Sequence, residues 1–188
     1  MQRQLAALTL TLLLGMVLGR SLLMRREGIK AFHFGNIDKK DFLIPPFAAF
    51  YFYIVFAAAF GFPTIANHQF FQCAAVSWAG VFFCVAGLVV VVLSLVSFGR
   101  SFRVGIDTEQ PDKLITNGVF AFSRNPIYVA FWLVLLGEFL VFSTPILLIY
   151  FFASIWLIHR QVLREEQFLR QHCGREYLDY CGQVRRYL

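Results

Sequence analysis

The sequence predicts an all-α integral membrane protein with about five transmembrane helices, a C-terminal helical hairpin and a cytoplasmic amphipathic tail. Of its 188 residues, 59% are hydrophobic and only 15% are charged, whereas a soluble domain is nearer half apolar and a quarter charged. Apolar runs of membrane-spanning length alternate with short polar connections. Neither a repeat nor a long polar linker divides the chain, so we expect one domain, 1–188.

Three apolar runs in residues 1–98 form the N-terminal part of this domain. They cover residues 5–23, 44–62 and 73–98. The third run contains Gly80 and Gly87, and small residues at such positions let a second helix approach closely. Residues 99–188 hold a loop, the helical hairpin and the tail.

The hairpin begins at residues 114–128, where a polar loop leads into a fourth apolar run, residues 127–142. Pro126 suits the first turn of a helix because it lacks an N–H and has a fixed φ. Ser123 or Asn125 can cap the open amides of that turn. Glu138 is the single acidic residue in the run, and we expect it to be hydrogen-bonded between helices.

A second cap-plus-proline signal, Ser143-Thr144-Pro145, starts a fifth run that continues without a breaker to Glu165 and Glu166. A helix over this distance rises about 30 Å, roughly one hydrocarbon thickness. Glu165 and Glu166 should therefore return to the membrane face where Arg124 and Tyr128 lie. The sequence predicts a site where these two polar clusters meet.

Charge placement orients the spans. Lys and Arg gather between the first and second runs, between the third and fourth, and after the fifth. Residues 63–72 and the 143–145 turn contain none. The positive-inside rule then places the N-terminus outside and the site on the cytoplasmic face. This also explains the net charge of +6 without a nucleic-acid partner, and the short loops suggest a prokaryotic inner (plasma) membrane.

The tail after the fifth run has its own pattern. Gly174 is a predicted helix stop, and Tyr177, Tyr180, Val184 and Leu188 follow at helical spacing. Such a stripe predicts a helix that either lies on the membrane or closes over the loops.

Several common sites are not indicated. The four cysteines form no C-x-x-C pair, and the four histidines lack partners at metal-ligand spacing, so we expect no metal. The chain also contains no phosphate-binding loop, dinucleotide fingerprint or nucleophile elbow.

Residues 114–128, the hairpin, the Glu165-Glu166 pair and the Gly174, Tyr177, Tyr180 ending together resemble the isoprenylcysteine carboxyl methyltransferase family. Its superfamily includes the phospholipid N-methyltransferases. The resemblance covers residues 98–188 and implies a membrane enzyme that uses S-adenosylmethionine. The cofactor-binding residues it implies are Asp112, Lys113, Leu114, Ile115, Phe120, Asn125, Pro126, Ile127, Tyr128 and Glu165.

The chain departs from this family at two positions. Asn125 stands where the family has a histidine, so the reaction here needs no imidazole at that place. Gln161 stands where the isoprenylcysteine enzymes place a substrate-binding arginine, with Arg160 and Arg164 on either side.

The residue types fit methyl transfer to a lipophilic small molecule or lipid-modified acceptor. Carboxylate and aromatic groups such as Glu165, Phe120 and Tyr128 suit a sulfonium cation. A carboxylate acceptor needs a cation such as Arg160 or Arg164 to position it. An amine acceptor, as in a phospholipid N-methyltransferase, must lose a proton, for which Glu166 or Tyr128 are candidates. The alternatives are a non-catalytic membrane protein and a reductase-like relative that binds a nicotinamide cofactor.

Overall fold

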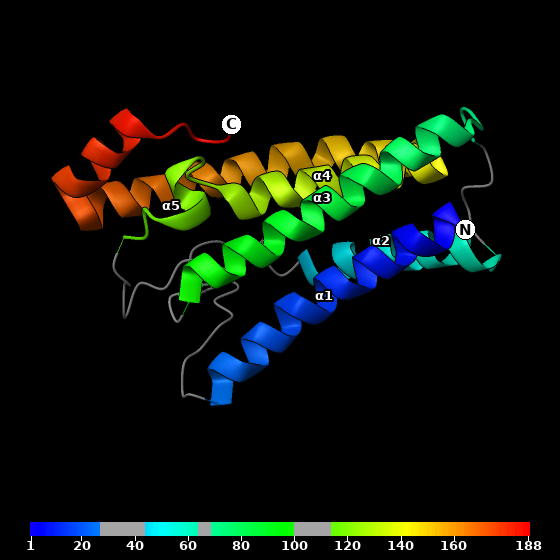
Figure 1. Ribbon diagram of the computed structural model, residues 1–188, viewed down its shortest axis with the longest axis horizontal. Helices are drawn as coiled ribbons and strands as arrows, with labels where there is room; N and C mark the ends of the chain where they lie inside the picture. The colour runs from blue at the N-terminus through cyan, green and yellow to red at the C-terminus, as the bar shows by residue number, and fades with distance from the viewer. Residues whose placement is uncertain (27–43, 64–68, 100–113) are drawn as a thin grey trace.

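The computed structural model describes residues 1–26, 44–63, 69–99 and 114–188, and within these ranges the chain forms helices and no strands. The five α-helices of the described ranges are labelled in Figure 1. They are α1 (Gln2–Arg26), α2 (Ile44–Phe60), α3 (Ala74–Phe98), α4 (Pro126–Phe142) and α5 (Pro145–Gln183), with the 3₁₀ turn η3 (Gly118–Ala121) before α4. The predicted all-helical fold is confirmed, and each of the five predicted apolar runs coincides with a helix.

In the described part of the chain, three helices are long and apolar enough to cross a membrane: α1, α3 and α5. Helices α2 and α4 are apolar but shorter, at 17 residues each. That length is at the lower limit of about 17–25 residues for a spanning helix.

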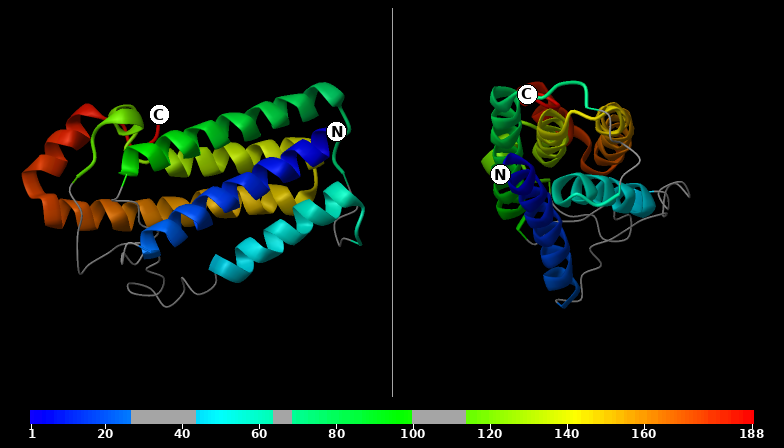
Figure 2. Two further views of the ribbon diagram at one scale, coloured as in Figure 1. Left: turned by 60° about the horizontal axis from the view of Figure 1, so that its bottom comes forward. Right: turned by 90° about the vertical axis from the view of Figure 1, so that its right-hand side faces the viewer.

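The helices lie side by side along the long axis of the molecule (Figures 1 and 2). The most extensive contact joins α3 to α4. A core of buried residues from all five helices includes Leu10, Val55, Val81, Phe142 and Leu147.

Glycines bring α3 and α4 together, as the small-residue pattern predicts. A β-carbon on Gly80 would lie 2.6 Å from the carbonyl oxygen of Gly137, and one on Gly87 would lie 2.7 Å from that of Ala130. Both distances are shorter than any normal contact, so the two backbones can approach this closely only because no side chain intervenes.

We expect Gly80→Ala to lower stability by about 1–3 kcal/mol, the usual range for overpacking, because the added methyl group meets backbone that cannot turn aside. Gly15→Ala in α1 is the matched control, since nothing lies within 4 Å of its added β-carbon. Thermal unfolding in detergent micelles measures both. Equal melting temperatures for the two variants would contradict this account of the α3–α4 contact.

The turn between α4 and α5 forms where the second cap-plus-proline signal predicts it. Ser143 has a φ of 48° and ends α4, while Thr144 and Pro145 begin α5. The Ser143 hydroxyl donates to the carbonyl oxygen of Phe71 at 2.6 Å, which ties the turn to the start of α3. The two helices therefore run antiparallel and bring their polar ends together.

The tail differs in part from its prediction. Gly174, with φ 54° and ψ −121°, kinks α5, and the helix then resumes to Gln183. Tyr177 and Tyr180 are buried, but Val184 is extended. The helical stripe therefore does not reach Val184 or Leu188. Hereafter "the C-terminal segment" means residues 175–188, the last part of α5 and the residues after it, which turn back toward the loop before α4 in Figure 1.

Glu138 also differs from its expected environment. It is fully buried, and neither carboxyl oxygen has a hydrogen-bond partner in the described ranges. The Tyr51 hydroxyl, likewise without a partner there, is near enough to interact electrostatically but not to bond. The expectation of a hydrogen-bonded Glu138 was wrong, since neither carboxyl oxygen meets a donor in the described ranges.

Candidate functional site

The hairpin brings Tyr128 of α4 and Glu165 of α5 into direct contact. The two residues are 37 positions apart in sequence, and the Tyr128 hydroxyl donates to Glu165 Oε1 at 2.6 Å. Gln161, one helical turn before Glu165, donates to the same oxygen at 2.9 Å. Glu165 therefore lies at the level of Tyr128, as the helical rise of α5 predicts.

The neighbouring carboxylate, Glu166, binds two arginines. Arg186 makes a two-pronged contact, with Nη2 to Oε2 at 2.8 Å and Nε to Oε1 at 3.1 Å. Arg124 Nη2 approaches Oε1 at 3.1 Å. The Glu166 side chain is only 5% exposed. The hydrogen bonds to Glu166 raise the pKa of Arg186. Because Glu166, Arg124 and Arg186 come from α5, the loop before α4 and the C-terminal segment, their ion pairs hold these three parts together.

Backbone contacts fasten the C-terminal segment to the same loop. The Arg124 N–H donates to the Arg185 carbonyl oxygen at 2.9 Å. The Tyr180 hydroxyl donates to the Phe120 carbonyl oxygen at 2.6 Å. Of the two arrangements expected for the tail, this geometry matches closure over the loops.

Asn125 also contacts the C-terminal segment, although the sequence predicted it as a possible helix cap. It occupies the N-cap position of α4 but makes no side-chain cap, and its amide donates to the Arg186 carbonyl oxygen at 3.1 Å. The Ser123 hydroxyl instead accepts a bond from the Asn125 N–H at 3.2 Å. The amide of Asn125 therefore faces the C-terminal segment. Pro126 begins α4 as predicted.

The turn η3 sets the position of this loop. Gly118 has a φ of 62°, and a β-carbon there would collide with the Ser97 hydroxyl of α3. Glycine is therefore required on both counts. The buried Phe120 ring packs edge-on against Phe98 at 4.8 Å between centroids, which anchors the turn on α3.

Of the remaining predicted cofactor residues, Ile127 packs against Met24 of α1, in a cluster that also holds Leu95 and Phe98 of α3. Leu114 and Ile115 are half-buried and lead into η3. Asp112 and Lys113 lie outside the described residues.

The two candidate acceptor anchors occupy a different side of α5. At ~3.6 residues per turn, Arg160 lies about 140° around the helix from Glu165, and Arg164 about 100°. The Arg160 guanidinium lies over the exposed Trp156 ring, 5.9 Å from its centroid. The position that faces Glu165 is that of Gln161.

Four residues at this end of the hairpin were not predicted from sequence: Trp132, His159, Arg186 and Tyr187. Trp132 follows Tyr128 by one helical turn, a spacing that could have been noticed. Arg186 and Tyr187 gave no local signal, because their partners are distant in sequence.

The arrangement suits a cationic ligand. A carboxylate, Glu165, lies beside the phenol of Tyr128, and carboxylate and aromatic groups together stabilise a positive charge. In the described ranges, no group of three or more His, Cys, Asp or Glu residues could hold a metal ion.

Comparison with known proteins gives a family match. Residues 75–176 match the phospholipid methyltransferase family. A probable protein-S-isoprenylcysteine O-methyltransferase of Oryza sativa subsp. indica is 33% identical over 126 residues, which are 65% of this chain and 63% of that protein. Protein-S-isoprenylcysteine O-methyltransferase B of Arabidopsis thaliana is 29% identical over 126 residues, 65% of this chain and 61% of the relative.

A mammalian relative matches over a shorter range. Protein-S-isoprenylcysteine O-methyltransferase of Rattus norvegicus is 29% identical over 111 residues, 57% of this chain and 39% of that protein. The chain thus covers less than two thirds of each of these relatives. The family match spans α3, α4 and most of α5 and ends at residue 176, before Arg186 and Tyr187.

Proposed function

Because the chain belongs to the phospholipid methyltransferase family, we propose that it is a membrane-embedded, S-adenosylmethionine-dependent methyltransferase acting on a lipophilic acceptor. It works as one integral membrane domain, in which α3 to α5, the preceding loop and the C-terminal segment form the site.

The observation that carries this proposal is the contact between Tyr128 and Glu165. A sulfonium methyl donor is a cation, and this pair offers it a carboxylate and a phenol ring, with the hydroxyl oxygen and Oε1 2.6 Å apart. Asn125, Pro126 and Ile127 would shape the same pocket, as would the half-buried Leu114 and Ile115. Asp112, Lys113 and Phe120 complete the proposed set of binding residues.

When bound, S-adenosylmethionine supplies an electrophilic methyl group, and the protein's part is to orient the acceptor and exclude water. The C-terminal segment covers the loop that carries Arg124 and Asn125 and so contributes to that exclusion. Two guanidinium groups bind Glu166, which favours a structural role for it. For an amine acceptor, Glu165 is the better-placed proton acceptor, whereas the Tyr128 hydroxyl already donates its proton to that carboxylate.

Two acceptor classes remain, and each has support. The relatives' names point to an isoprenylcysteine carboxylate, and the family name points to a phospholipid. Gln161 donates to Glu165 where the isoprenylcysteine enzymes have their substrate arginine. A carboxylate acceptor would therefore depend on Arg160 or Arg164.

The membrane arrangement is also part of the proposal. Helices α2 and α4 would join α1, α3 and α5 as spans, since 17 residues can cross a thin or compressed bilayer. From the charge pattern we expect the site on the cytoplasmic face. A prokaryotic inner membrane stays a prediction from the short loops, because the relatives named above are from plants and a mammal.

The test is transfer of an isotope-labelled methyl group from S-adenosylmethionine to either an N-acylated S-isoprenylcysteine or phosphatidylethanolamine vesicles. A carboxylate is ionised above pH ~5, so its rate should be nearly flat from neutral to alkaline pH. Its product would be a base-labile methyl ester. An amine reacts in its neutral form, so its rate should climb with pH until the amine has titrated. Absence of labelled product with both acceptors would contradict the proposal.

A further inference from the structure

A second polar cluster lies deeper in the hairpin than the Tyr128–Glu165 pair. His159 Nδ1 of α5 lies 2.7 Å from the Tyr187 hydroxyl. The Tyr187 ring packs on the Trp132 ring of α4, with 4.8 Å between centroids. Three separate parts of the chain therefore meet here: the first half of α4, the middle of α5 and the end of the C-terminal segment.

The indole of Trp132 points to a ligand in this cluster. Its Nε1 is buried and has no hydrogen-bond partner in the described ranges. A buried N–H without a partner costs about 1–3 kcal/mol, so it is expected to receive an acceptor oxygen in the working state.

The Tyr187 hydroxyl supplies a second donor beside this N–H. Burial raises the pKa of Tyr187, so the phenol keeps its proton at neutral pH. If His159 donates from Nδ1 to the phenol oxygen, the phenol proton is left to point at a ligand. With their rings 4.8 Å apart between centroids, Trp132 and Tyr187 bring an indole N–H and a phenol O–H into one cluster, and two such donors suit an anionic oxygen.

The depth of the cluster indicates which ligand it meets. Trp132 lies about 6 Å further into the bundle than Tyr128, and His159 about 9 Å further than Glu165, by helical rise. A soluble methyl donor approaches from the polar end of the hairpin. A lipophilic acceptor approaches from the membrane and reaches the Trp132 level first.

We propose that Trp132 and Tyr187 bind an anionic oxygen of the acceptor's polar head and that His159 positions the Tyr187 hydroxyl for this contact. The oxygen belongs to the carboxylate of an isoprenylcysteine or to the phosphate of a phospholipid. The inference rests on the proposed methyltransferase function and names the side of the site that takes the acceptor.

The test uses Trp132→Phe and Tyr187→Phe, which remove one donor each and keep the aromatic contact. With S-adenosylmethionine saturating, each should raise the acceptor KM about tenfold, the loss expected for one hydrogen bond to a charged group. Equilibrium binding of the labelled acceptor without methyl donor should weaken by a similar factor. Affinity for S-adenosylmethionine should change less than twofold.

Two variants at distant positions serve as controls. Trp78→Phe alters an exposed tryptophan of α3, and Tyr53→Phe removes a hydroxyl that donates to the Pro63 carbonyl oxygen. Both should leave the acceptor KM unchanged. His159→Asn, whose amide can still donate to Tyr187, should retain more acceptor affinity than His159→Leu.

The outcomes separate this inference from the function on which it rests. If the unaltered protein binds S-adenosylmethionine but both donor variants keep the normal acceptor KM, the acceptor subsite is wrong and the enzyme stands. If the unaltered protein binds no S-adenosylmethionine, the proposed function itself is wrong. The acceptor whose KM rises, isoprenylcysteine or phosphatidylethanolamine in vesicles, identifies the oxygen as carboxylate or phosphate.

Discussion

Replacing Glu166 by alanine is expected to release the C-terminal segment from the hairpin. The free energy that holds the segment in place should fall by about 3–5 kcal/mol, the usual cost of removing one partner of a buried ion pair. The change leaves Arg124, whose side chain is 10% exposed, without its carboxylate. Arg186 loses both prongs of its contact at the same time. Because the segment can detach locally, its opening should precede global unfolding.

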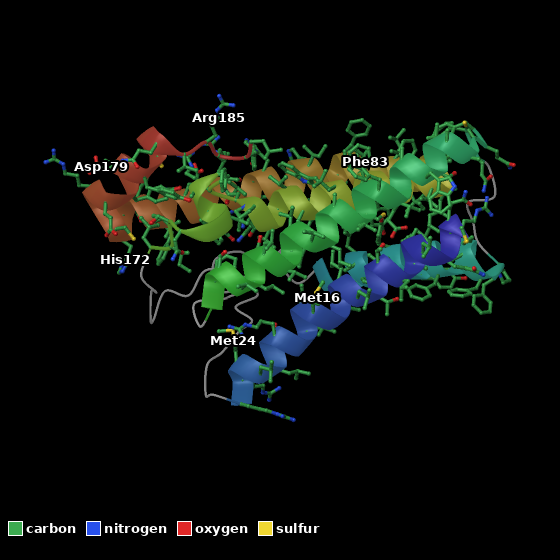
Figure 3. All side chains as sticks on the ribbon, in the orientation of Figure 1. Met16, Met24, Phe83, His172, Asp179 and Arg185 are labelled. Carbon is green, nitrogen blue, oxygen red and sulfur yellow. The ribbon has the colours of Figure 1, made fainter. Side chains whose placement is uncertain are left out.

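Hydrogen exchange measures this opening directly. Amides of residues 175–188 should exchange faster in Glu166→Ala, while those of α3 keep their protection. Glu176→Ala, which removes an exposed carboxylate from the same segment, is the control. Arg186→Ala should resemble Glu166→Ala, whereas Arg185→Ala should not, since the Arg185 side chain points away from the helices in Figure 3. Unchanged exchange in Glu166→Ala would mean that the ion pairs do not hold the segment.

The second large effect is expected at Glu165. Glu165→Gln should weaken S-adenosylmethionine binding by about 1.5–3 kcal/mol, the range for a hydrogen bond to a charged group. It also removes the negative charge that a sulfonium requires. The glutamine can still accept the hydrogen bond from Tyr128, so the melting temperature should stay nearly constant.

Isothermal titration with the methyl donor measures this loss, and Glu176→Gln provides the matched control at an exposed carboxylate. Tyr128→Phe should have a smaller effect, because it keeps the ring and the Glu165 charge. If Glu165→Gln bound the donor as tightly as the unaltered protein, Glu165 would have no place in the donor pocket.

Local signals in the sequence were sufficient for the helices and the hairpin. Pro126 and Pro145 mark helix starts because their fixed φ and missing N–H suit no other helical position so well. Glu165 could be placed beside Tyr128 because helical rise converts residue number into distance. Gly80 and Gly87 were recognisable because close helix packing needs small residues.

The contacts of the C-terminal segment could not be predicted in this way. Arg186 was recognisable only as a positive charge, and its pairing with Glu166 depends on the direction that the chain takes after Gly174. The φ and ψ of a glycine are hardly restricted by its own sequence. Ser123 or Asn125 was expected to cap α4, but Asn125 makes no side-chain cap, and its amide N–H donates instead to a carbonyl of the returning chain.

The hydrogen bonding of Glu138, inside the helix bundle, could not be predicted from the sequence either. The sequence shows a carboxyl group in an apolar run, but whether it finds a donor depends on the rotation of four helices about one another. In the structure its oxygens meet no donor in the described ranges.

Binding of S-adenosylmethionine to the purified protein tests the central claim most directly, with a nicotinamide cofactor as the rival ligand. We expect saturable binding of S-adenosylmethionine that is weakened in Glu165→Gln, and no binding of the reduced nicotinamide dinucleotide. Saturable binding of the nicotinamide with none of S-adenosylmethionine would contradict the account and favour a reductase.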